Sequence, residues 1–299
     1  MSNYHVEPLY FQSEKEIIAS DFYYPTYVSQ PAVIVMAHGL AAERNFGLSL
    51  FAKQFVQAGY AVICFDYRGY GGSTGKPRGM VSIQQQLQDW KNVLQQIQKR
   101  KDIDTRRIVL WGASLSGGHV LQLASELKFI QAIISQTPYI DGQESFKLYP
   151  KKYLSKVSTL IAKDYMAKKL GLEPQLIPVI ESNAPCCYFD ITLAQGYLHL
   201  VPSYRDRIEA IPARIMYSLA RYRPIQEVRK ITIPVFLLGA TQDQWVPIES
   251  TRLCATNLAP FAQYHEFPIG HFDAFFEQWF DKNIRLQISF LHQHVGVEP

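Results

Sequence analysis

Residues 108–120 read IVLWGASLSGGHV, an apolar run that leads through Gly112 into a segment with the pattern of a helix. Ser114 stands at the junction, and a sharp turn there requires small residues two positions away, as Gly112 and Ser116 are. A Gly-x-Ser pattern alone is common by chance, but here both the strand and the helix are clear. The stretch predicts a serine hydroxyl at the carboxyl edge of a sheet. The backbone N–H of Leu115, in the first turn of the helix, is placed to bind a developing oxyanion.

Strands and helices alternate on both sides of this junction. Runs that are apolar throughout are typical of parallel strands covered on both faces, and segments with one apolar face are typical of helices packed on a sheet. Residues 1–24 alternate with the period of a strand and predict an antiparallel hairpin. Buried strands are predicted at 32–37, 60–65, 107–111, 132–136, 235–238 and 262–267, and helices at 45–58, 82–100, 115–127, 249–258 and 273–292. This order predicts an α/β fold with a doubly wound, mostly parallel sheet.

The alternation stops in segment 142–230, which contains no run with the character of a buried parallel strand. We therefore predict that 1–141 and 231–299 form the core domain and that 142–230 is a mostly helical insertion. Its helical patterns are separated by prolines and lie at 151–170, 203–209 and 214–222.

The stretch 111–118, WGASLSGG, resembles the nucleophile elbow of the α/β-hydrolase superfamily. The usual Gly-x-Ser-x-Gly pattern departs here at its last position, Ser116, which is still small. Elbows that end in Ser-Gly-Gly are similar to those of dienelactone-hydrolase-like proteins and polyketide acyltransferases. The resemblance covers about 30–141 and 231–292, and it implies the α/β-hydrolase fold with Ser114 as nucleophile.

Two loops extend the resemblance. Residues 38–45, HGLAAERN, are similar to the superfamily's oxyanion loop, which implies that the N–H of Leu40 is the second oxyanion donor beside Leu115. We expect His38 to order this loop and not to act as the base. Residues 65–75, FDYRGYGGSTG, resemble a glycine-rich turn found in many α/β-hydrolases, and we interpret them as scaffold in which Asp66 and Arg68 tie the loop by hydrogen bonds.

A serine nucleophile needs an imidazole base and a carboxylate that orients it, and in this fold the chain order is serine, acid, histidine. Of the eight histidines, His271 alone follows a predicted strand within a Gly-His step. Residues 239–247, GATQDQWVP, resemble the turn that carries the acid, and they place Asp243 in that role. Asp141, at the end of an earlier strand, is the main competitor. Asp273 is predicted to cap the final helix.

In this superfamily an insertion at the place of segment 142–230 often forms a cap. The resemblance implies that the segment covers the site and sets the shape of the substrate. Its many aromatic side chains suit an apolar acyl group. The segment could also bury a partner surface in a homodimer.

The composition fits an ordinary globular protein, with 47% hydrophobic and 19% charged residues among 299. No apolar run is long enough to span a bilayer, and the N-terminus lacks the pattern of a signal peptide, so we expect a cytoplasmic protein. The four cysteines show no metal-ligand spacing. No nucleotide motif or nucleic-acid-binding module is recognisable, so neither a cofactor, a metal nor a nucleic-acid partner is expected.

The positive charge is concentrated in one part of the chain. Segment 142–230 carries 14 Lys and Arg against 8 Asp and Glu, whereas the remainder carries 16 against 18. One interpretation is a solvated helical surface. The other is a basic approach to the site that attracts an anionic acyl substrate, such as a thioester of CoA or of a carrier protein.

These patterns predict a serine hydrolase that cleaves an ester or thioester of a small molecule through an acyl-enzyme. Two enzymatic alternatives are an acyltransferase that uses the same acyl-enzyme and a short-peptide peptidase. A non-enzymatic alternative is a small-molecule receptor that retains the triad. Dehalogenases and epoxide hydrolases are disfavoured, because they carry an aspartate where Ser114 stands.

Overall fold

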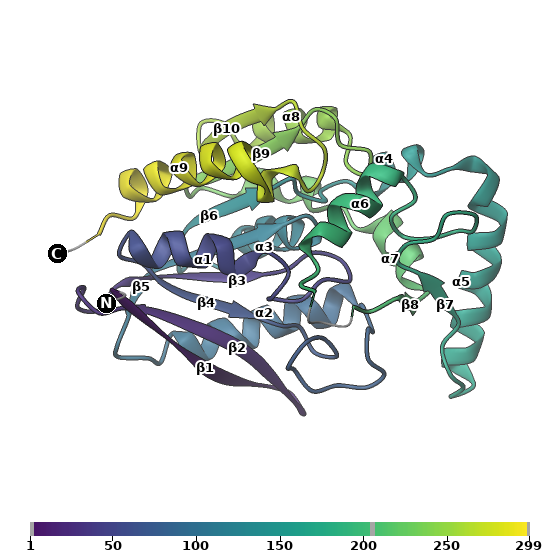
Figure 1. Ribbon diagram of the computed structural model, residues 1–299, viewed down its shortest axis with the longest axis horizontal. Helices are drawn as coiled ribbons and strands as arrows, with labels where there is room; N and C mark the ends of the chain where they lie inside the picture. Colours follow the sequence, from purple (N-terminus) through teal and green to yellow (C-terminus); the bar gives the residue numbers. More distant parts are fainter. Residues whose placement is uncertain (1–2, 204–206, 298–299) are drawn as a thin grey trace.

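The computed structural model describes residues 3–203 and 207–297 of the chain. An eight-stranded sheet runs through the described part, in the order β1-β2-β4-β3-β5-β6-β9-β10 (Figure 1). The β1–β2 and β2–β4 pairs are antiparallel, and the remaining pairs are parallel. The strands are β1 Tyr4–Ser13, β2 Glu16–Pro25, β3 Ala32–Ala37, β4 Ala61–Phe65, β5 Asp104–Ala113, β6 Ile130–Gln136, β9 Val235–Ala240 and β10 Ala262–Phe267. The predicted hairpin and mostly parallel sheet are confirmed.

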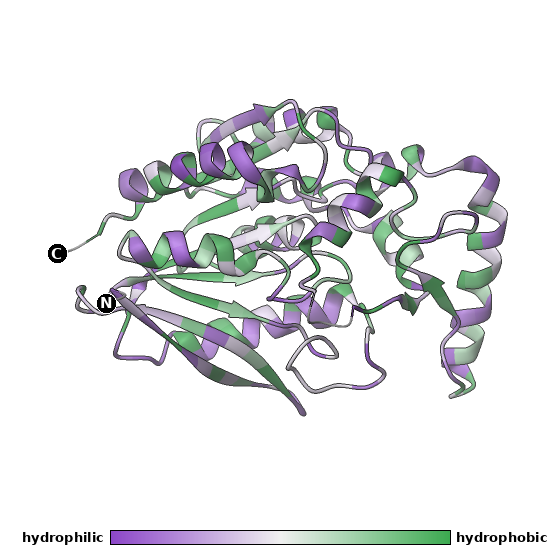
Figure 2. Cartoon of the chain, viewed as in Figure 1, coloured by the Kyte–Doolittle hydropathy of each residue, from purple (hydrophilic) through white to green (hydrophobic). Residues whose placement is uncertain are grey.

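The centre of the sheet explains why its strands are apolar throughout. Every residue of β3, β4 and β9 is buried. Figure 2 shows hydrophobic residues along these central strands, whereas the outer helices mix hydrophobic and hydrophilic residues. A strand covered by helices on both faces has no solvent side, so the usual alternation of polar and apolar residues disappears.

Helices cover both faces of the sheet. Trp111 on β5 contacts Phe51 of α1 at 5.0 Å between ring centroids and donates to Gln287 of α9 at 2.9 Å. The next residue, Gly112, faces the carbonyl of Ser116 in α3. Since successive residues of a strand point to opposite faces, α1 and α9 lie on one face and α3 on the other. The helices of the core are α1 Leu48–Gln57, α2 Ile83–Ile97, α3 Leu115–Glu126, α8 Ile248–Leu258 and α9 Glu277–His294.

Segment 142–230 lies beside the carboxyl ends of the parallel strands, in teal and green in Figure 1. Its described part adds no strand to the main sheet but forms a separate antiparallel pair. Its elements are α4 Gly142–Leu148, α5 Leu154–Lys169, β7 Leu176–Pro178, α6 Ile191–Leu200, β8 Ala210–Pro212 and α7 Ile215–Arg221, with short 3-10 turns at Lys151–Tyr153, Pro224–Gln226 and Val228–Lys230.

The predictions differ from the structure mainly around this segment. The helix predicted at 203–209 lies partly outside the described residues, and the described positions 207–209 are not helical. Helix α6 and the β7–β8 pair were not predicted. The single helix predicted at 273–292 is interrupted, because a 3-10 turn at Asp273–Phe275 ends before α9, and Glu277, the first residue of α9, has a φ of 46°. A left-handed residue cannot continue an α-helix.

Candidate active site

Ser114 occupies the sharp turn between β5 and α3. Its φ of 55° and ψ of −120° form a strained combination for a residue with a side chain. The end of β6 and the loop after it hold this backbone, since the Ser114 N–H donates to the Gln136 carbonyl at 3.0 Å and the Ser114 carbonyl accepts from the Tyr139 N–H at 2.8 Å. A Cβ on Gly112 would lie 2.2 Å from the Ser116 carbonyl oxygen. The turn therefore requires glycine at position 112 and presents the Ser114 hydroxyl at the carboxyl edge of the sheet.

The structure brings Ser114, His271 and Asp243 into one hydrogen-bonded chain. His271 Nε2 lies 2.8 Å from Ser114 Oγ, and His271 Nδ1 lies 2.6 Å from Asp243 Oδ2. Both Ser114 and His271 are buried, with 4% and 3% of their surface exposed. A carboxylate accepts only, so it favours the tautomer with the proton on Nδ1 and leaves Nε2 free to accept the serine proton.

Asp243 is fixed by its own turn. Its Oδ1 accepts from the backbone N–H groups of Trp245 at 2.7 Å and Val246 at 2.9 Å. These two bonds occupy one carboxylate oxygen and direct the other toward His271. The three residues come from the loops after β5, β9 and β10, which meet because parallel strands end at the same edge.

The other two candidate aspartates have different roles. Asp141 caps α4, where it accepts from the N–H of Gln143 at 3.1 Å, and it pairs with the Arg223 guanidinium at 2.8 Å. The prediction that Asp273 caps the final helix is wrong. Its Oδ2 accepts from the Gly270 N–H at 2.8 Å, since the chain there turns back to shape the loop that carries His271.

The predicted oxyanion loop packs directly against the nucleophile. A Cβ on Gly39 would lie 3.0 Å from Ser114 Cβ, so a larger residue would push the loop away. Leu40 is 1% exposed and lines the same hollow as Ser114 and His271. Leu115 begins α3, where the first backbone N–H groups lack partners within the helix. Leu40 thus lines the hollow at Ser114, and Leu115 directly follows Ser114 in the chain.

His38 holds the loop from within. Its Nδ1 lies 3.0 Å from the Gly39 carbonyl, which can only accept, so Nδ1 carries the proton. Burial lowers the pKa of His38, which keeps the ring neutral. Its Nε2 has no hydrogen-bond partner among the described residues. This geometry agrees with the expectation that His38 orders the loop.

The glycine-rich turn after β4 is tied as expected, but to other parts of the core. Asp66 accepts from the backbone N–H of Arg44 at 2.7 Å and pairs with its guanidinium. Arg68 pairs with Asp89 of α2 at 2.6 Å. The two residues therefore hold the turn against the oxyanion loop and α2 and do not bond to each other.

Tyrosines of segment 142–230 reach the oxyanion loop, a contact that was not predicted. Tyr188 donates to the Leu40 carbonyl at 2.8 Å, and Tyr197 donates to the Ala41 carbonyl at 2.7 Å. The sequence shows these tyrosines only as two of many aromatic residues in the segment, because the partners lie about 150 positions away. No local pattern could have identified them.

The hollow at Ser114 is small and enclosed. Its volume of about 20 Å³ is room for about one water molecule. Apolar side chains from the core and from segment 142–230 close it, among them Phe46, Leu48, Tyr188, Leu200, Phe272 and Phe275. A substrate therefore requires some of these side chains to move before its carbonyl can reach Ser114.

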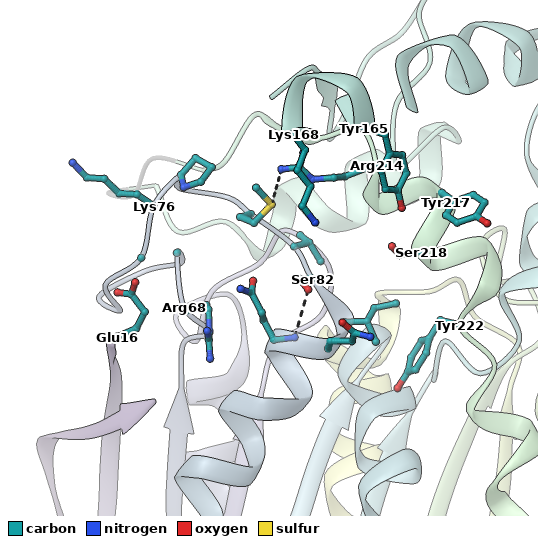
Figure 3. Close-up of a pocket in the computed structure, with 18 of the residues that line it drawn as sticks. Glu16, Arg68, Lys76, Ser82, Tyr165, Lys168, Arg214, Tyr217, Ser218 and Tyr222 are labelled. Carbon is teal, nitrogen blue, oxygen red and sulfur yellow. Dashed lines mark hydrogen bonds between the residues drawn. The ribbon is translucent and has the colours of Figure 1, made fainter. Parts of the chain in front are cut away.

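A larger hollow of about 710 Å³ lies apart from Ser114 (Figure 3). It is bounded by the turn after β4, the start of α2, and helices α5 and α7. Five cationic side chains line it: Arg68, Lys76, Lys168, Arg214 and Arg221. Arg68 and Arg214 are neutralised by Asp89 and Asp164, whereas Lys168 is exposed on α5. Part of the positive charge of segment 142–230 thus faces this hollow.

Two further kinds of feature are absent from the described residues. None of the helices there combines the length and apolar character that crossing a membrane requires. The same residues include no group of three histidine, cysteine, aspartate or glutamate side chains that could hold a metal ion.

Comparison with known proteins places the chain in a family. Residues 29–278 match the family model described as serine aminopeptidase, S33. A quorum-quenching protein, AidA of Acinetobacter baumannii, is 34% identical over 96% of this chain and 95% of that protein. A thiohydrolase, aneE of Aspergillus aculeatus, is 25% identical over 72% of this chain and 70% of that protein.

Solved structures agree on the fold. The α/β-hydrolase GrgF from Penicillium sp. sh18 superimposes with a TM-score of 0.83 at 20% identity, over 97% of this chain and 99% of that one. The expected resemblance and fold are confirmed. The chain therefore belongs to the serine aminopeptidase S33 family and is an enzyme of the α/β-hydrolase fold.

Proposed function

We propose that this protein is a serine hydrolase that cleaves an ester or thioester of a small molecule through an acyl-enzyme. Ser114 is the nucleophile, His271 the general base and Asp243 the residue that orients the base. The observation that carries this proposal is the continuous hydrogen-bonded chain from Ser114 Oγ through the imidazole to the Asp243 carboxylate, at 2.8 and 2.6 Å. The thiohydrolase relative supports a thioester as one substrate class.

In the first half of the reaction His271 Nε2 takes the hydroxyl proton while Ser114 Oγ attacks the acyl carbonyl carbon. The Leu40 and Leu115 amides stabilise the oxyanion of the tetrahedral intermediate. The imidazolium, stabilised by Asp243, then gives its proton to the departing oxygen or sulfur. In the second half water attacks the acyl-enzyme, His271 takes the water proton, and Ser114 receives it when the acid product leaves.

Acyl transfer is the second candidate, and the enclosure of the site favours it. With Ser114 and His271 nearly inaccessible, bulk water is kept from the acyl-enzyme, which lengthens its lifetime for another acceptor. A hydrolase and a transferase differ only in what attacks the acyl-enzyme. Product analysis with and without an added alcohol or amine therefore separates them.

We also propose that segment 142–230 acts as a cap on a core formed by 1–141 and 231–299. Tyr188 and Leu200 of this segment help to close the hollow at Ser114. Their side chains, with those of Phe46 and Phe272, form an apolar wall that suits an acyl chain. The cap therefore sets the shape and length of the acyl group.

An anionic handle on the substrate is a further part of the proposal. The hollow of Figure 3 lies beside the turn after β4, at the same edge of the sheet as Ser114. Its exposed cations suit the phosphates of a CoA or carrier-linked thioester. A double Lys168→Ala and Arg221→Ala variant should raise KM for an acyl-CoA but not for a neutral ester. Lys163→Ala is the control, because Lys163 lies on α5 like Lys168 but does not line the hollow.

The main experiment measures turnover of short- and medium-chain p-nitrophenyl esters, acyl-CoA thioesters and aminoacyl p-nitroanilides. Wild type should turn over at least one class, Ser114→Ala should lose that activity, and Ser158→Ala, an exposed serine on α5, should keep it. Turnover of the anilides alone would replace the esterase proposal with a peptidase. Activity that survives in Ser114→Ala would contradict the proposed nucleophile.

A further inference from the structure

The first carbonyl of the oxyanion loop is held from the core side. Trp90 Nε1 donates to Tyr67 Oη at 2.8 Å, Tyr67 Oη lies 2.5 Å from Ser116 Oγ, and Ser116 Oγ lies 2.5 Å from the His38 carbonyl. An indole N–H can only donate and a carbonyl can only accept. The proton order is therefore fixed from Trp90 to His38, and Ser116 donates to the loop.

The next part of the loop is held from segment 142–230. The Tyr188 hydroxyl donates to the Leu40 carbonyl at 2.8 Å, and the Tyr197 hydroxyl donates to the Ala41 carbonyl at 2.7 Å. The two tyrosine rings lie 5.1 Å apart and support each other. The loop is thus hydrogen-bonded to the nucleophile elbow on one side and to segment 142–230 on the other.

These contacts are suited to fix a strained backbone. Ala41 has a φ of 56°, a left-handed conformation that a residue with a side chain adopts at a cost. Tyr188 is 2% exposed and Tyr197 is fully buried, and burial raises the pKa of both phenols, so each hydroxyl keeps its proton and donates. A buried carbonyl that loses its donor has no water to replace it.

We propose that Tyr188 and Tyr197 are positioning residues for the oxyanion hole, and that the hole is complete only while segment 142–230 lies against the loop. Their hydroxyls hold the backbone on the C-terminal side of the Leu40 N–H, and this inference rests on the proposed function of that amide. Tyr188 and Leu200 of the segment help to close the small hollow at Ser114, and we infer that the segment moves when a substrate enters. Opening the segment breaks both bonds, so the site stabilises an oxyanion only after it has closed again over the substrate.

The test uses three tyrosine-to-phenylalanine variants of the full chain. Tyr188→Phe and Tyr197→Phe each remove one hydroxyl from the loop. Tyr149→Phe is the matched control, because Tyr149 is equally buried and donates to a backbone carbonyl within segment 142–230, that of Cys186, at 3.0 Å. Each variant leaves one buried carbonyl without its donor, so a similar fall in Tm is expected for all three. Tyr197 is the decisive position, because it does not line the hollow at Ser114.

Activity is measured as kcat and KM for the best p-nitrophenyl ester, together with the inhibition constant of phenylboronic acid. A boronate on Ser114 places a negatively charged oxygen in the oxyanion hole, so its affinity reports the hole directly. We expect kcat to fall by about tenfold or more in Tyr197→Phe, less than the 10²–10³-fold cost of removing a donor outright. The inhibition constant should rise in parallel, and KM should change little.

Three results are decisive. Tyr188→Phe and Tyr197→Phe that match Tyr149→Phe in kcat and in boronate affinity overturn the inference while leaving the proposed function intact. A loss of kcat with unchanged boronate affinity also overturns it, since the defect then lies outside the hole. Wild type that neither turns over an ester nor binds the boronate at Ser114 contradicts the proposed function, and the inference fails with it.

Discussion

Replacing Asp243 by asparagine separates orientation of the base from the shape of the site. The asparagine oxygen can still accept from Trp245 and Val246, which hold Asp243 Oδ1 at 2.7 and 2.9 Å. Its amide nitrogen then faces His271 Nδ1, and an N–H group there donates where the carboxylate accepted. The imidazole must take the tautomer with the proton on Nε2, and it can no longer accept the proton of Ser114.

The expected loss follows from this change of tautomer. In enzymes with this chain of groups the substitution costs about 10⁴-fold in kcat, equivalent to about 5 kcal/mol of barrier. The native turn is retained, so the free energy of unfolding should fall far less than the barrier rises. Ester turnover and urea unfolding, measured on the same preparations, check both statements.

Asp141→Asn is the matched control. Asparagine is as good an N-cap as aspartate, so α4 keeps its cap and only the charge partner of Arg223 is lost. This variant should keep the wild-type kcat. If instead Asp141→Asn abolished turnover while Asp243→Asn retained it, the assignment of the acid would be refuted.

Three more changes follow from the same geometry. Ser116→Gly restores the glycine typical of the superfamily. It should nevertheless lower ester kcat, and it should lower the free energy of unfolding measured in urea by about 1–3 kcal/mol, because Tyr67 and the His38 carbonyl lose their hydrogen-bond partner. An unchanged kcat would contradict this. Gly112→Ala should yield no soluble folded protein on expression, since its Cβ would lie 2.2 Å from the Ser116 carbonyl oxygen; a wild-type Tm would contradict this. Burial lowers the pKa of His119 to about 3, so between about pH 6.5 and 3 the unfolded chain binds more protons than the folded one. The free energy of unfolding should therefore decrease as the pH is lowered through this range, by up to about 1.4 kcal/mol per pH unit. Urea unfolding between pH 7 and 5 should show that the free energy of unfolding depends less steeply on pH in His119→Gln than in wild type. Equal pH dependence in the two proteins would refute the assignment to His119.

Much of the core could be predicted because its signals are local. The apolar runs of β3, β4 and β9 reflect burial on both faces, and the elbow needs small residues at fixed positions around Ser114. The positions of Asp243 and His271 follow from strand order, since loops after parallel strands meet at one edge.

Segment 142–230 could be predicted only in outline, because its elements depend on tertiary contacts. Asp190 is the N-cap of helix α6, and its side chain accepts from the Thr192 N–H; this capping pattern was the one local signal for the helix. Asp273 was predicted to be a helix cap because it precedes a helical pattern, but the Gly270 N–H competes for its carboxylate. The contacts of Tyr188 and Tyr197 join residues 148 and 156 positions apart, which no local pattern encodes.

The central claim is that Ser114 is an activated nucleophile. Its most direct test is intact-protein mass spectrometry after brief treatment with a fluorophosphonate, which reacts only with serines that have been activated by a base. We predict one adduct on wild type, mapped to Ser114 by peptide digestion, no adduct on Ser114→Ala and a much slower reaction of His271→Ala. Wild type that stays unlabelled, or an adduct that persists in Ser114→Ala, would contradict the account.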